Sequence, residues 1–248
     1  MRRYIAGTLL VLGIVASTAW GDDFWVKKSW KEWTKSDCKK LLEDSPWAKR
    51  FTVENTSTVG SMPSASHDAA STSGPSVAGS GVIEYHVQIR SAEPIRQAII
   101  RQDQLANNYD KMSEEEKKGF DAKEEEQFSK FQGDVIAFHV LCETNAALQP
   151  SLTVYWQSFP EGTFPEDLYV LGDGGAKIPP VIFISKAGRD TEFDAVFPRS
   201  PNGQPLVAPG AKSIKFQFKN PKLGDFSAKV VNAEFKLDKM NWNGKPEF

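Results

Sequence analysis

Three histidines and two cysteines are the residues of this 248-residue chain best suited to acid–base, nucleophilic or metal chemistry. His139 lies in an apolar run three residues before Cys142, a spacing that suggests a base beside its nucleophile. In an extended strand, however, odd and even positions project to opposite faces, so these two side chains diverge. The pattern predicts a structural, partly buried imidazole at His139 rather than half of a catalytic dyad.

The sequence lacks the usual metal-binding motifs. It contains no His-Glu-x-x-His segment and no paired Cys-x-x-Cys, the spacings typical of zinc sites. His67 lies in a Ser- and Gly-rich stretch, and His86 falls on the polar side of an alternating strand. We therefore expect no metal site and no cofactor.

The two cysteines allow two interpretations. Exported proteins commonly pair their cysteines, and a Cys38–Cys142 disulfide would close a loop of roughly 100 residues, worth about 4 to 5 kcal/mol in the chain-entropy model. In the alternative, both are small buried thiols, with Cys38 beneath Trp33 and Cys142 within a sheet. Counting thiols in the unfolded, unreduced protein distinguishes the two.

Other patterns for catalysis are weaker. Ser80 lies between two glycines but lacks the Gly-x-Ser-x-Gly pattern, and the glutamate runs within 114–126 are typical of a solvated helix face. A carbohydrate site combines carboxylates with aromatic rings. One Pro-rich stretch holds both kinds of residue: Glu161, Glu166, Asp167, Trp156, Phe159 and Phe164. A secreted or periplasmic hydrolase that brings His139 and distant carboxylates such as Glu166 together stays open as an alternative function.

Four tryptophans are concentrated near the N-terminus: Trp25, Trp30, Trp33 and Trp47. Either they form an aromatic surface that binds a glycan, a peptide or a membrane, or they dock the N-terminal segment on the rest of the protein. Burial of all four would exclude the binding surface.

Helix signals are clearest in the first half of the chain. Thr34 followed by Asp37 approximates a capping box, so we expect a short helix that ends at Ser45-Pro46. Apolar spacing after Pro94 predicts a second helix to about Ala106. Ser113 with Glu116 predicts a third, which runs towards Phe131.

Strand signals surround and follow these helices. Alternating apolar residues predict strands at 51–56 and 83–90, and the continuous apolar run 135–142 predicts a central strand covered on both faces. From Ser151 onward helix signals are few, and short strands are expected at 181–184, 191–197, 214–218 and 230–237. Asn243-Gly244 predicts a tight turn. The expected fold is α+β, with N-terminal helices packed on an antiparallel, sandwich-like β-sheet.

The chain divides into segments of different composition. Residues 1–21 predict a signal peptide, because Met1-Arg2-Arg3 precedes an apolar run and Ala19-Trp20-Gly21 supplies small residues before a cut at Asp22. Residues 60–81 are almost wholly Ser, Ala, Gly, Pro and Thr, which predicts a flexible loop. A helix and a strand within 22–59 are too small for a core of their own, so we assign them to the same domain as 82–248.

Charge and hydropathy narrow the class of partner. The formal net charge of −2 argues against a dedicated nucleic-acid protein. No segment after the signal is long and apolar enough for a transmembrane span. The expected product is exported, either periplasmic or secreted, with a protein or glycan as partner.

Short motifs are spread over most of the chain: Trp30-x-x-Trp33-Thr34, Asp44-Ser45-Pro46-Trp47-Ala48, Ile83-x-Tyr85-x-Val87, Ser91-Ala92 and Phe197-Pro198-Arg199. Together they resemble an uncharacterised family of exported bacterial proteins. The resemblance implies bacterial export and a mixed fold, and it brings no catalytic residues. The leading hypothesis is therefore a non-catalytic binding or structural domain.

Overall fold

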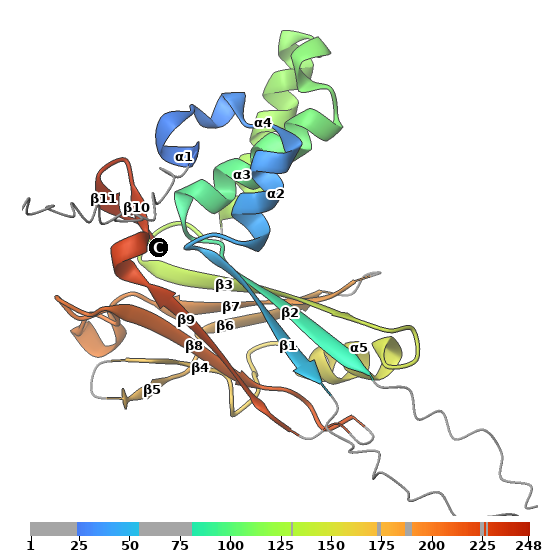
Figure 1. Cartoon of the computed structure of the whole chain (residues 1–248), viewed down its shortest axis with the longest axis vertical. Helices are drawn as coiled ribbons and strands as arrows, with labels where there is room; N and C mark the ends of the chain where they lie inside the picture. Colours follow the sequence, from blue (N-terminus) through green and yellow to red (C-terminus); the bar gives the residue numbers. More distant parts are fainter. Residues whose placement is uncertain are drawn as a thin grey trace, which may run out of the picture.

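The computed structural model describes residues 24–54, 81–129, 131–172, 175–186, 190–223, 226 and 228–248. The expected signal peptide at 1–21 and nearly all of the expected loop at 60–81, with His67 and Ser80, lie outside the described residues. The described part has three layers: a group of helices, a first sheet and a second sheet (Figure 1).

The first sheet, sheet A, forms the middle layer. Its five antiparallel strands have the order β1-β2-β3-β7-β6. Their bounds are Ala48–Glu54 for β1, Val82–Ile89 for β2, Val135–Thr144 for β3, Ile182–Lys186 for β6 and Thr191–Pro198 for β7. The central strand is β3, and most of its side chains are buried, as its continuous apolar run predicts.

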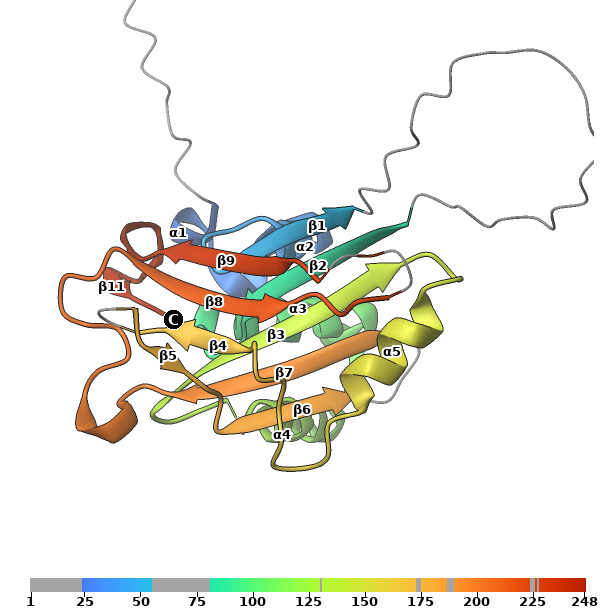
Figure 2. The same ribbon diagram turned by 90° about the horizontal axis from the view of Figure 1, so that it is seen from below.

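The second sheet, sheet B, packs on one face of sheet A. Its strand order is β5-β4-β8-β9, with bounds Tyr169–Leu171 for β4, Lys177–Ile178 for β5, Ser213–Lys219 for β8 and Val230–Lys236 for β9. Aromatic rings fill the space between the sheets: Phe138 stacks on Phe216 at 4.4 Å, and Tyr85 meets Phe218 edge-on at 5.0 Å. In Figure 2, β9, β8 and β4 lie in front of sheet A.

The opposite face of sheet A carries the helices. These are α1 (Phe24–Lys27), the 3-10 turn η1 (Trp30–Glu32), α2 (Lys35–Glu43), α3 (Glu93–Ala106), the turn η2 (Tyr109–Lys111) and α4 (Glu114–Ser129). The three helices predicted from capping and spacing are confirmed. Thr34 and Ser113 both form the expected capping interactions, for example Thr34 Oγ1 accepting from the Asp37 N–H at 3.2 Å.

One helix, α5 (Gln149–Gln157), was not predicted, because helix signals are few from Ser151 onward. Pro150 is compatible with a first helical turn, because the N–H that proline lacks has no partner there. Leu152 and Trp156, four residues apart, lie on one helix face and are wholly buried.

The chain ends in a small hairpin of β10 (Asn241–Trp242) and β11 (Lys245–Pro246), preceded by the turn η5 (Leu237–Lys239). Asn243 and Gly244 connect the strands with φ values of 50° and 78°. Two left-handed residues are what a type I′ hairpin turn requires, so the predicted tight turn is confirmed.

The α+β class with helices on an antiparallel sandwich is thus confirmed. None of the helices in the described part of the chain is both long enough and apolar enough to cross a membrane.

Candidate functional site

Three of the four N-terminal tryptophans are core residues. Trp25, Trp33 and Trp47 are 6%, 1% and 0% exposed, and Trp25 meets Trp47 edge-on at 5.9 Å. Trp242 of the C-terminal hairpin contacts Trp33 at 6.0 Å, and the indole N–H of Trp47 donates to the Glu247 carbonyl at 2.7 Å. The expected aromatic binding surface is wrong for these three residues, which instead dock the N-terminal segment on the hairpin.

Trp30 is the exception, because it is only partly buried and lines a cleft of about 610 Å³. The cleft lies between η1 and the pair α3 and α4, and its volume is within the range of small-ligand pockets. Apolar and aromatic side chains from four elements, η1, α3, η2 and α4, contribute to its wall: Trp30, Ile100, Tyr109 and Phe128. We call this the Trp30 cleft.

A buried carboxyl group lies in the Trp30 cleft. Glu124 is 6% exposed, and its Oε2 atom has no hydrogen-bond partner. Burial raises its pKa, and the carboxylates of Asp103 and Asp121 raise it further while Lys123 opposes them. The expectation that the 114–126 glutamates are all solvated is wrong here, because Glu124 shares a helix face with buried Phe128.

Three other polar groups of the Trp30 cleft, Arg96, Arg101 and Tyr109, have hydrogen-bond partners. Arg96 donates to the Ser91 carbonyl, and Arg101 donates to the Trp33 carbonyl at 3.2 Å. The Tyr109 hydroxyl donates to Asp121 at 2.8 Å. Glu124 is therefore the buried group in the cleft with unused hydrogen-bonding capacity.

His139 is buried on the helix-bearing face of sheet A, with a 4% exposed side chain. Its Nδ1 contacts Asp194 at 2.8 Å, and its Nε2 lies 3.3 Å from Glu192. Lys186 contacts both carboxylates, at 3.3 Å and 3.7 Å. Strand register explains the group, because His139 is paired with Asp194 in β7 and Glu192 lies two residues away on the same face.

The environment of His139 favours a neutral ring. Burial and the positive charge of Arg90 lower its pKa to about 4, against the opposing effect of Asp194. Arg90 and Lys186 already balance Asp194 and Glu192, so a charged imidazole would leave a net buried positive charge. With both nitrogens occupied and little exposure, His139 has the features of a structural residue.

The cysteines are free thiols, and both are buried. Cys142 lies on the same side of β3 as Phe138, which faces sheet B, whereas Cys38 belongs to α2 on the other side of sheet A. The sheet stands between them, so the disulfide interpretation is wrong in this structure. Cys142 and His139 diverge on opposite faces, as expected.

The carboxylates of the Pro-rich stretch are separated in the structure, and only Glu161 shares a cleft with an aromatic ring, that of partly buried Phe159. Trp156 is wholly buried and stacks on Phe193 at 4.3 Å. Asp167 pairs with Lys219 at 3.3 Å, and Glu166 is exposed. The arrangement gives no support to a carbohydrate site at Trp156.

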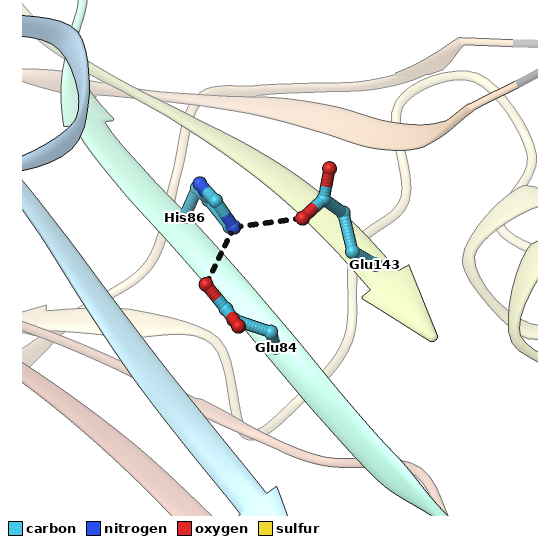
Figure 3. Close-up of side chains that lie close together, drawn as sticks. All are labelled: Glu84, His86 and Glu143. Carbon is cyan, nitrogen blue, oxygen red and sulfur yellow. Dashed lines mark ion pairs between the residues drawn. The ribbon is translucent and has the colours of Figure 1, made fainter. Parts of the chain in front are cut away.

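A second histidine cluster was not anticipated from the sequence. The Nε2 atom of His86 lies 2.9 Å from Glu84 Oε1 and 3.0 Å from Glu143 Oε2 (Figure 3). Glu84 and His86 are two residues apart on β2, and Glu143 lies opposite Glu84 on the neighbouring strand β3. The Glu-x-His spacing was visible in the sequence, but only the strand register brings Glu143 to it.

Models of known protein families, curated proteins and solved structures were compared with this chain, and none of them matches it.

Proposed function

We propose that this chain is an exported, non-catalytic binding protein that holds a cationic, partly apolar group of a peptide partner in the Trp30 cleft. Export is supported by the Arg2-Arg3 start and the apolar run that follows it. The observation that carries the binding proposal is a buried carboxyl group without a hydrogen-bond partner on Oε2 beside a partly exposed indole.

The charge of the cleft favours a cation near Glu124. The carboxylates of Asp103 and Asp121 both raise the pKa of Glu124, so two further acidic groups act on this position, whereas Arg96 and Arg101 of the same cleft donate to backbone carbonyls. An ammonium or guanidinium group there gains attraction in a site with little water. Trp30 and Phe128 supply apolar and aromatic surface for the aliphatic stem or a neighbouring ring.

The hydrolase alternative has less support. It needs a solvent-accessible acid or base, whereas the His139 side chain is 4% exposed and both of its ring nitrogens contact carboxylates. Neither His139 nor Glu166 belongs to the Trp30 cleft.

The proposal is tested by titrating the untagged chain with the capped dipeptide acetyl-Phe-Lys-amide and following the Trp30 indole N–H signal by NMR. We expect that signal to shift on binding, and Glu124→Gln to weaken binding about tenfold, which corresponds to about 1.4 kcal/mol. Loss of the carboxylate charge is the physical reason.

Matched controls separate charge recognition from general adhesion. Glu126 lies on an exposed part of the same helix, so the Glu126→Gln variant should bind the dipeptide as tightly as the unmodified chain does. The neutral analogue acetyl-Phe-Gln-amide should bind more weakly than the lysine form. Equal binding of both dipeptides, or a shift produced by a neutral trisaccharide alone, would count against a cationic partner.

A further inference from the structure

Two carboxylates converge on one nitrogen of His86, and this sets the cluster apart from every other histidine contact in the described residues. At His139 the two carboxylates approach opposite ring nitrogens, which no single ion can join. At His86 both approach Nε2, and the three donor atoms all lie within 4.8 Å of one another. Figure 3 shows the Glu84 and Glu143 side chains both directed towards the ring.

The contacts of His86 Nε2 are close but are not hydrogen bonds. His86 has a side chain only 10% exposed, and its Nε2 atom is buried without a partner of hydrogen-bond geometry. A buried polar atom without a partner carries a free-energy cost. A cation held between the three atoms would remove this cost.

The spacing suits a metal ion. Zinc binds imidazole nitrogen and carboxylate oxygen at about 2.0 to 2.2 Å, so tetrahedral ligand atoms lie about 3.3 to 3.6 Å apart. The two Nε2 contacts, at 2.9 and 3.0 Å, need to open by only about half an ångström. Glu143, with a side chain 59% exposed, has the freedom to make this adjustment.

We propose that Glu84, His86 and Glu143 bind one divalent transition-metal ion, with zinc as the best-matched ion, and leave a coordination position open to water. One imidazole and two carboxylates are donors that zinc accepts, and three protein ligands are typical of an open site. The partial exposure of Glu84 and Glu143 gives an ion access from solvent. The site is separate from the Trp30 cleft and does not depend on the proposed peptide binding.

Arg50 competes with the ion for Glu84. Its guanidinium lies 3.3 Å from Glu84 Oε1, the same oxygen that approaches His86, and it also pairs with Glu43 of α2. Arg50 therefore supplies a positive charge at the edge of the cluster when no metal is bound. Its removal should increase the affinity for a cation, whereas a purely structural ion-pair cluster gives no such gain.

Zinc titration of the untagged full chain by calorimetry tests the site, with the visible absorption of bound Co²⁺ as an independent readout of inner-sphere coordination. We expect one equivalent bound with micromolar affinity. Glu143→Gln, at an exposed position, should weaken binding at least tenfold without loss of fold, which circular dichroism checks. Arg50→Gln should strengthen binding severalfold.

Two control variants identify the site. His139→Gln and His67→Ala should keep one equivalent of zinc, because the proposed ligands are Glu84, His86 and Glu143. Absence of zinc binding in the millimolar range would overturn the proposal. Unchanged affinity in both Glu143→Gln and His86→Gln, or loss of zinc binding in His67→Ala, would overturn it as well.

Discussion

His86 and His139 show how neighbouring residues with the same chemistry acquire different roles. Both lie on the helix-bearing face of sheet A. His139 of β3 is the partner of Gln88 in β2, and Gln88 lies two residues after His86. His139 has a carboxylate at each ring nitrogen and two balancing cations nearby. His86 has both carboxylates at one nitrogen, with Arg50 beside Glu84. The charges around His139 are already paired with one another, whereas the three atoms of the His86 cluster can accept a cation between them.

The lowered pKa of His139 predicts a specific pH dependence of stability. Between pH 6.5 and pH 4 the unfolded chain binds a proton at this residue while the folded chain does not, so stability falls as the pH falls through this window. The slope contributed by one residue is at most about 1.4 kcal/mol per pH unit. Urea unfolding at several pH values, compared between the unmodified chain and His139→Gln, isolates this contribution. A difference between the two that slopes the opposite way would mean that the folded state holds a protonated His139.

At the scale of elements, the N-terminal segment is held at both ends of α2. Thr34 caps its start through the Asp37 N–H, and Ser45 Oγ donates to the Leu41 carbonyl near its end at 2.7 Å. Gln88 of β2 donates to the Leu42 carbonyl at 2.8 Å. Arg101 of α3 also donates to the Trp33 carbonyl at 3.2 Å, directly after η1, and this contact keeps Trp30 beside α3.

Thr34→Ala should lower the free energy of unfolding by about 1 kcal/mol, because the N–H of Asp37 loses its acceptor. Ser36→Ala, at the next exposed hydroxyl of the same helix, should change it by less than about 0.5 kcal/mol. Chemical denaturation of both variants measures the difference. Equal effects at the two positions would show that the cap contributes nothing specific.

At the scale of the whole molecule, sheet A separates two packed layers. Phe138, Phe216 and Phe218 belong to the layer between the sheets, whereas Phe128 and Phe131 pack on Ala137 and Val196 beneath α4. Cys142 belongs to the first layer and Cys38 lies on the helical side. This partition, and not the distance along the chain, keeps the thiols apart.

Thiol titration checks that partition. The unreduced protein unfolded in guanidinium should present two reactive thiols per chain, whereas the folded protein should react very slowly. Both side chains are buried in the folded state, and burial raises the pKa of Cys38 to about 11. A sample treated with reductant supplies the reference value of two. Zero reactive thiols in the unfolded, unreduced protein would instead show a disulfide.

Much of the fold follows from local signals, because caps and apolar periodicity act over a few residues. The helix after Thr34, the strand from Val82 to Ile89 and the Asn243-Gly244 turn are all readable from neighbouring residues. The helix at 149–157 is not, because Pro150 has the same local signature at a helix start as at a break. Short β4 and β5 carry too few residues for periodicity to identify them.

The sequence by itself determined the fold class, the starts of α2, α3 and α4 and the divergence of His139 from Cys142, because each depends on spacing and caps within single elements. Only the tertiary structure decided which tryptophan stays partly exposed, on which sides of sheet A the cysteines lie, and that Glu143 joins Glu84 and His86. Those outcomes depend on strand register and layer packing, which bring together residues that are distant along the chain.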